Sequence, residues 1–187
     1  MDHYLDIRLR PDPEFSAAQL MNALCAKLHR ALVLLQNEVI GISFPAVQPQ
    51  RPALGDCLRL HGSVAALRDL LAQPWLSGVR DHVQVGEVTA VPASVQYRSV
   101  SRVQVKSNVE RLRRRLIHRH NLTADEAAQR IPDAAERSLD LPFISLRSQS
   151  TAQSFRLFIQ HGPLQASPEP GVFNTYGLGS GATIPWF

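Results

Sequence analysis

Residues 4–35 have the sequence YLDIRLRPDPEFSAAQLMNALCAKLHRALVLL. In residues 4–9 every second side chain is apolar, which is typical of a half-buried β-strand. Ser16 and Gln19 then form the pattern of a capping box, in which each side chain binds the main-chain amide of the other. From there apolar side chains recur at helical spacing, so we expect a helix from Ser16 to about Leu35 with one buried face. These side chains are Leu20, Leu24, Leu28, Ala31, Leu32 and Leu35.

The next segments predict three more strands and a second helix. They are strands at 39–44, 57–61 and 82–91, and a helix from Ser63 to about Gln73. The last strand contains Gly86, where we expect a bend. The resulting order, β-α-β-β-α-β, is that of a ferredoxin-like domain.

The second half of the chain predicts a different arrangement. We expect the ferredoxin-like domain to occupy residues 1–94, followed by an extended linker at 95–104. A smaller α+β domain, beginning with an arginine-rich helix, is expected at 105–187. Two strands within it, 141–147 and 154–160, are expected to pair as a hairpin. The predicted fold class is therefore α+β.

The basic residues are concentrated in one segment. The 187 residues include 20 basic and 16 acidic ones, which gives a formal net charge of +4. Between Arg98 and His120 lie eight of the basic residues and one acid, Glu110. Eighteen of the 20 basic residues are Arg, whose planar guanidinium suits phosphate and carboxylate groups, although a GC-rich genome would also enrich Arg. The local excess predicts a binding site for a polyanion.

This segment carries the signature of a helix with one cationic face. Ser107 and Glu110 form a capping box, which predicts a helix from about Asn108 to His120. Its apolar residues Val109, Leu112 and Leu116 form the opposite stripe. A solvated helix usually alternates the sign of its charges, so the pattern favours a phosphate-binding face. Whether the partner is DNA or RNA does not follow from it. The residues on the cationic face are Arg111, Arg114, Arg115, His118 and Arg119.

Several classes of protein are excluded or disfavoured. The longest apolar run, 31–35, is far too short to span a membrane, and the N-terminus does not resemble a signal segment. The two cysteines, Cys25 and Cys57, lack metal-ligand spacing, so free thiols in the cytoplasm are the simplest expectation. The acidic residues are scattered, which disfavours cleavage by two metal ions. We therefore predict no metal and no cofactor.

Metal-free cleavage of RNA remains chemically possible, because the 2′-hydroxyl of the substrate can act as the nucleophile. Such cleavage needs a base near that hydroxyl, and His29 lies on the flank of the first apolar helix stripe. The residues alone favour a structural role for His29. A loop with three hydroxyl groups precedes Phe155, although ordinary turn chemistry also explains such residues. The hydroxyl residues are Ser148, Ser150 and Thr151.

Longer stretches resemble a known family over essentially the whole chain. They include residues 1–10, Lys27-Leu-His29, residues 100–104, residues 110–116, residues 146–151, residues 155–159 and the final Pro185-Trp-Phe187. In these stretches the chain resembles the CRISPR-associated endoribonuclease of type I-F systems, which cuts precursor CRISPR RNA within its repeat.

The resemblance implies an activity and partners. The ferredoxin-like domain would be joined to a domain whose arginine helix lies in the major groove of the repeat hairpin. Cleavage would be metal-independent, at the 3′ base of the stem, leaving a 2′,3′-cyclic phosphate on the upstream fragment. The enzyme, a monomer when free, would stay on its product and join the other subunits of the type I-F surveillance complex.

The resemblance also implies roles for single residues. His29 would be the catalytic histidine, Ser148 the residue that constrains the 2′-hydroxyl, and Tyr176 the tyrosine that helps to set the histidine. Arg102 and Gln104 would read the base of the stem. The stacking aromatic would be Phe155, the contacts near the scissile phosphate Ser150 and Thr151, and the helix contacts Arg114, Arg115, Arg119 and His120. His118 stands where the family implies Arg, so a phosphate contact there would be pH-dependent.

Three hypotheses remain. The first is a hairpin-specific endoribonuclease, and the second is a non-catalytic subunit that binds an RNA hairpin with the same helix. The third, a DNA-binding protein, explains only the charge.

Overall fold

The computed structural model describes residues 1–187 except 49–51, 105–108, 132–139 and 149–151. Contacts divide the chain into two compact units, Met1–Val103 with Leu141–Phe187, and Gln104–Asp140. This division groups segments by contact, so the domain boundaries expected at residues 94 and 104 stay a prediction. Within the described ranges, no helix is both long and apolar enough to cross a bilayer.

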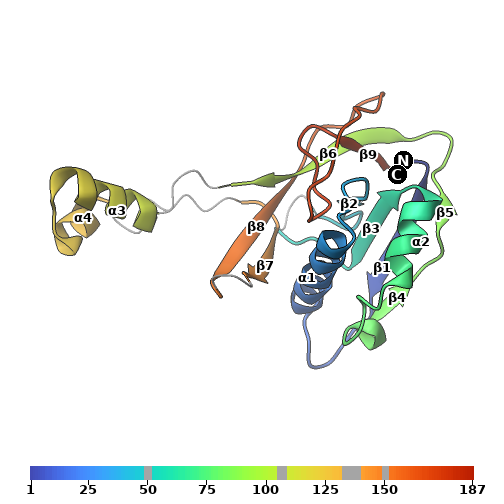
Figure 1. The fold of residues 1–187 in the computed structure, drawn as a ribbon, viewed down its shortest axis with the longest axis horizontal. Helices are drawn as coiled ribbons and strands as arrows, with labels where there is room; N and C mark the ends of the chain where they lie inside the picture. Colours follow the sequence, from blue (N-terminus) through green and yellow to red (C-terminus); the bar gives the residue numbers. More distant parts are fainter. Residues whose placement is uncertain (49–51, 105–108, 132–139, 149–151) are drawn as a thin grey trace. The chain divides into compact units, whose positions relative to one another are not determined.

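The N-terminal sheet of the larger unit has the predicted topology (Figure 1). Its strands lie in the order β2-β3-β1-β4, all antiparallel, with β5 paired to the start of β1. That order, reached through two connecting helices, is the ferredoxin-like arrangement, which confirms the prediction. The strands are β1 (His3–Leu9), β2 (Gly41–Ser43), β3 (Cys57–Gly62), β4 (Val83–Val85) and β5 (Thr89–Ala90).

Two helices, α1 (Ala17–Leu34) and α2 (Val64–Ala72), cover one face of this sheet (Figure 1). Both begin at the predicted caps. The Ser16 side chain accepts from the amide of Gln19, whose own side chain accepts from the amide of Ser16. Ser63 caps α2 in the same way through the amide of Ala66. The predicted apolar face of α1 is buried, with Leu35 as its C-cap.

A second sheet of four antiparallel strands completes the larger unit, in the order β7-β8-β6-β9. The predicted hairpin is confirmed as β7 (Phe143–Arg147) and β8 (Ser154–His161). The stretch expected as a linker contains β6 (Gln96–Val103), which pairs with β8 and with β9 (Thr183–Trp186). Only Val100 of β6 is buried, so the apolar alternation that identifies a strand is almost absent there.

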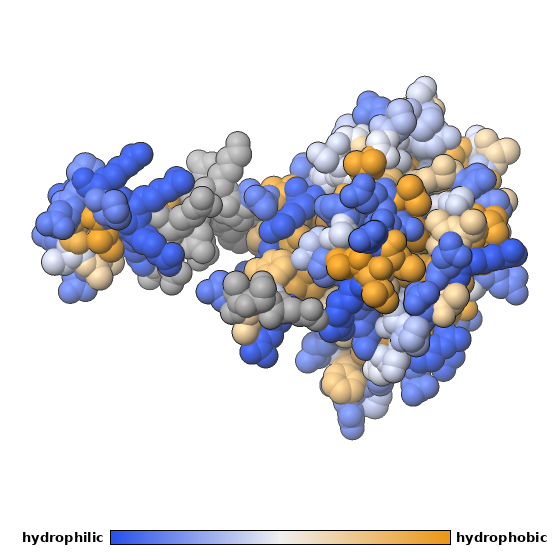
Figure 2. Space-filling view, viewed as in Figure 1, coloured by the Kyte–Doolittle hydropathy of each residue, from blue (hydrophilic) through white to orange (hydrophobic). Residues whose placement is uncertain are grey.

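The described residues of the smaller unit contain two helices, α3 (Val109–His120) and α4 (Ala124–Arg130). Asn121 ends α3 with a left-handed backbone (φ 52°), a conformation that Asn tolerates. A capping box between Thr123 and Glu126 begins α4. The capping box expected between residues 107 and 110 lies outside the described residues. Hydrophilic side chains cover much of the visible face of this unit (Figure 2).

A buried ion pair joins the central strands on the side of the sheet away from the helices. Arg59 of β3 is 8% exposed and donates to both carboxylate oxygens of Asp6 on β1, at 2.6 and 3.0 Å. It also donates to the main-chain oxygen of Phe187, and its guanidinium lies over the rings of Tyr4 and Phe187. The pair therefore attaches the last residues of the chain to the N-terminal sheet.

We expect Asp6→Asn to lower the free energy of unfolding by about 3 kcal/mol, because it leaves a buried guanidinium without its counter-charge. Urea unfolding measures this change. The double variant Asp6→Asn/Arg59→Met removes both charges and should recover much of the loss. If Asp6→Asn costs no more than an exposed substitution such as Arg68→Gln, the pair does not hold this face together.

Candidate active site

His29 lies near the C-terminal end of α1, half-buried, at the margin of the core. Its Nδ1 is 2.9 Å from the main-chain carbonyl oxygen of Thr175. A carbonyl oxygen only accepts, so Nδ1 carries the hydrogen of this bond. In the neutral imidazole the lone pair is then on Nε2. This tautomer is the one that a histidine needs in order to accept a proton at Nε2.

Tyr176 fixes the plane of the same imidazole. The two rings are stacked, with centroids 3.9 Å apart and an angle of 6° between their planes. The hydrogen bond from Nδ1 sets the rotation of the ring and the stack sets its plane. Together they hold His29 in one orientation, which is what a group that must meet a proton at a fixed place requires.

The position of Tyr176 depends on a tightly bound loop, Phe173–Gly179. The side-chain oxygen of Asn174 accepts from the amides of Tyr176 and Leu178, at 2.8 and 3.2 Å. The amide of Ile42 donates to the carbonyl of Gly177, at 2.9 Å. Gly177 has φ +72°, and a Cβ there would lie 2.6 Å from Cγ2 of Ile42. Only glycine fits this position without displacing the loop.

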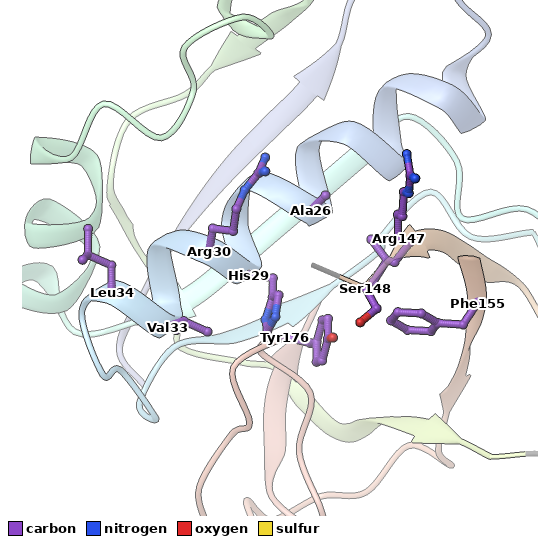
Figure 3. A pocket seen from close by; sticks show the side chains of 10 residues that line it. Ala26, His29, Arg30, Val33, Leu34, Arg147, Ser148, Phe155 and Tyr176 are labelled. Atoms are coloured by element: carbon purple, nitrogen blue, oxygen red, sulfur yellow. The ribbon is translucent and has the colours of Figure 1, made fainter. Parts of the chain in front are cut away.

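A cavity of about 710 Å³ lies beside His29 and Tyr176. Ser148 and Phe155, from the β7–β8 hairpin, line it together with residues of α1 (Figure 3). The side-chain oxygen of Asn22 accepts from the main-chain amide of Ser145, at 2.9 Å, and so joins α1 to β7. The remaining lining residues are Ala26, Arg30, Val33, Leu34, Leu146 and Arg147.

The structure thus brings together four of the predicted site residues, His29, Ser148, Phe155 and Tyr176. A fifth is near them, since the guanidinium carbon of Arg102 is 6.0 Å from the centroid of the Phe155 ring. The roles expected of these residues remain predictions.

The other predicted residues lie outside the described residues or belong to the smaller unit. Ser150 and Thr151 lie outside the described residues, as does the side chain of Arg111. Gln104 is exposed and belongs to the smaller unit. On α3 the predicted contacts are exposed, whereas Leu112, Leu116 and Ile117 are half-buried. Those exposed contacts are Arg114, Arg115, His118, Arg119 and His120.

Two further histidines of the larger unit, His61 and His161, do not line this cavity. Burial lowers the pKa of His61 to about 3 and that of His161 to about 4. Nδ1 of His61 and Nε2 of His161 are buried without a hydrogen-bond partner. Both rings are therefore neutral near neutral pH. In the described part of the chain, no three His, Cys, Asp or Glu side chains are grouped as metal ligands.

Sequence reasoning missed the groups that position the histidine. The carbonyl of Thr175 is 146 residues from His29 along the chain and carries no side-chain signal. Asn174 and Gly177, three residues apart, carry a sequence signal, since this spacing of Asn and Gly indicates a tight turn. Arg30 and Arg147 were also not singled out, and both line the cavity.

We expect Gly177→Ala to displace Tyr176 from His29. The strain of a left-handed alanine costs about 1–2 kcal/mol, and the contact with Ile42 adds to it. The ring protons of His29 should then lose the upfield NMR shift caused by the stacked phenol ring. Gly181→Ala is the matched control, because Gly181 is also left-handed (φ +96°) but has open space around its Cβ position. An unchanged His29 spectrum in Gly177→Ala would contradict the assignment of this role to the loop.

Comparison with known proteins agrees with the resemblance. The family described as CRISPR-associated protein (Cas_Csy4) matches residues 4–187. A protein of Pseudomonas aeruginosa (strain UCBPP-PA14) named CRISPR-associated endonuclease Cas6/Csy4 is 61% identical over 187 residues, the full length of both chains. A protein of the same name from Escherichia coli (strain UTI89 / UPEC) is 50% identical, again over the full length of both.

A solved structure described as "An RAMP protein binding different RNA substrates" covers 99% of both chains at 16% identity, with a TM-score of 0.35. The match to the family profile and the two full-length relatives establish the relationship without it. This chain belongs to the Cas_Csy4 family of CRISPR-associated proteins.

Proposed function

We propose that this protein is an endoribonuclease that cuts CRISPR repeat RNA at the 3′ base of its hairpin, without a metal ion. The observation that carries the proposal is the geometry of His29, whose Nδ1 is bound to the carbonyl of Thr175 and whose ring lines a cavity. The names of the two full-length relatives, both CRISPR-associated endonucleases, support the same activity.

In the proposed reaction Nε2 of His29 takes the proton of the 2′-hydroxyl. The 2′ oxygen then forms a bond to the adjacent phosphorus, and the bond from phosphorus to the 5′ oxygen of the next nucleotide breaks. That 5′ oxygen leaves with a proton from solvent or from the imidazolium. The products are an upstream fragment ending in a 2′,3′-cyclic phosphate and a downstream fragment with a 5′-hydroxyl. Atoms and charges balance without a further reactant.

Residues across the cavity would hold the reacting nucleotide. Ser148 would restrain the 2′-hydroxyl, and Phe155 would stack on the base at the foot of the stem. The guanidinium carbon of Arg102 lies over the Phe155 ring, 6.0 Å from its centroid, and the guanidinium would meet the two acceptors of a guanine near that ring. Gln104 suits an adenine edge in the same pairing logic.

The hairpin itself would be bound by the exposed basic face of α3. Ordinary A-form RNA hides its major groove from side chains, whereas a short hairpin is more open at its end. Leu112, Leu116 and Ile117 occupy the other side of α3 and leave the basic face available. Arg115 would read a guanine, and the other basic residues would neutralise phosphates. Such contacts would keep the protein on its cleaved product, within a larger complex in the cytoplasm.

His29→Ala should lower the cleavage rate by about 10²–10⁴-fold, because it removes the general base. Hairpin binding should be retained, since α3 is unchanged. The rate is measured by single-turnover cleavage of a labelled repeat hairpin in excess chelator. His82→Ala is the matched control, because His82 is also half-buried but binds Asp12 outside the cavity.

The same assay tests the nucleophile. A hairpin with deoxyribose upstream of the cut should bind and remain intact. Cleavage of this deoxy hairpin, or a need for metal, would overturn the mechanism. If the ribose hairpin is bound and never cut by the wild type, the protein is a non-catalytic hairpin-binding subunit.

A further inference from the structure

A second cavity lies beside α1. It has a volume of about 370 Å³ and is formed between α1 and the residues that follow α2. Gln73, Pro74 and the ring of Trp75 contribute one wall. Lys27, Arg30 and Leu34 of α1 contribute the other.

This second cavity adjoins the candidate active site. Arg30 and Leu34 line both cavities. Figure 3 shows His29 directed toward Tyr176, while the side chain of Arg30 leaves α1 in a different direction, away from that ring. A strand that leaves the active site over Arg30 therefore enters the second cavity.

The second cavity also has the charge that a phosphate chain needs. Lys27 and Arg30 are three residues apart on α1, so their side chains are neighbours on one side of the helix. No acidic side chain is among the residues that line either cavity in the described part of the chain. Within those residues Arg30 is exposed and makes no ion pair. Nζ of Lys27 donates one of its three hydrogens to the carbonyl of Ser77, so two hydrogens remain for other acceptors.

The position of the cavity decides which part of the RNA reaches it. Phe155 and Leu34 lie at opposite ends of the first cavity (Figure 3). If the foot of the stem rests on Phe155, as proposed above, the stem lies at that end. With the stem at that end, the chain beyond the cut, which is single-stranded, would leave toward Leu34 and Arg30.

We propose that the second cavity is a binding subsite for the single-stranded RNA immediately 3′ of the cut, with Arg30 and Lys27 each neutralising one phosphate. This inference rests on the proposed function, since it takes the direction of the RNA from it. The subsite holds the downstream strand before cleavage and lets it go afterwards, because the cut leaves it attached only by these contacts.

The test compares affinities of non-cleavable hairpins that carry deoxyribose upstream of the cut. One hairpin ends at the foot of the stem, a second carries a short single-stranded extension on its 3′ side, and a third carries the same extension on its 5′ side. The 3′ extension should tighten binding to the wild type by roughly tenfold at low salt, as expected for charge-assisted contacts. Two phosphates on single-stranded RNA should also steepen the slope of log Kd against log salt by about 1.4. The 5′ extension should do neither.

Lys27→Gln is the decisive variant. It should remove about half of the added salt slope and weaken binding of the 3′-extended hairpin, with the affinity for the unextended hairpin unchanged. That unchanged affinity also shows that the variant is folded. Lys27→Arg should restore the gain. The matched control is Arg68→Gln, which removes an exposed cation of α2 that lines neither cavity.

Three results would overturn the inference. They are a 3′ extension that adds no affinity, a 5′ extension that adds as much, and a Lys27→Gln variant that weakens both hairpins equally. Each can occur while the wild type still cuts a ribose hairpin in chelator. The subsite can therefore be refuted while the proposed function stands. Loss of that cutting would instead remove the proposed function.

Discussion

The attachment of the loop Phe173–Gly179 to both sheets is the constraint on which the candidate site depends. The carbonyl of Gly177 accepts from Ile42 of the first sheet, and the amide of Gly179 donates to the carbonyl of Val100 in the second. At its other end the amide of Phe173 donates to the carbonyl of Glu38, and between Phe173 and Gly177 the loop presents the Thr175 carbonyl and the Tyr176 ring to His29. A loop tied at one end would leave the imidazole free to rotate. The site is therefore a product of how the two sheets are joined within the larger unit.

The same constraint explains why the fold matters for chemistry. The first sheet supplies α1, which carries His29, and the second supplies the β7–β8 hairpin, which carries Ser148 and Phe155. The bond between Asn22 and Ser145 fixes these two walls relative to each other. The imidazole of His29 and the ring of Phe155 are thus held beside one cavity by main-chain geometry.

Much of the fold could be predicted because it follows from local patterns. The capping box at Ser16 and the apolar stripe of α1 define that helix in a stretch of about twenty residues. Strand β6 could not be predicted in this way, since Val100 is its only buried residue and its pairing partners are more than fifty residues away. The ferredoxin-like topology of the first sheet could nevertheless be predicted, because the strands of that sheet are strongly apolar.

The candidate site could also be predicted only in part from local sequence patterns. Residue patterns alone favoured a structural role for His29, and only the family resemblance joined it to Ser148 and Tyr176. The carbonyl that orients it belongs to the main chain, which no side-chain motif records. Arg30 could not be predicted as a site residue, because a single cation on an exposed helix face carries no functional signal without the cavities beside it.

The most direct test of the account is the tautomer of His29, read from the ring ¹⁵N chemical shifts at a pH where the imidazole is neutral. The account predicts a protonated Nδ1, bound to the Thr175 carbonyl, and an unprotonated Nε2. A ring protonated mainly at Nε2 would contradict it, because that nitrogen could not then accept the proton of the 2′-hydroxyl.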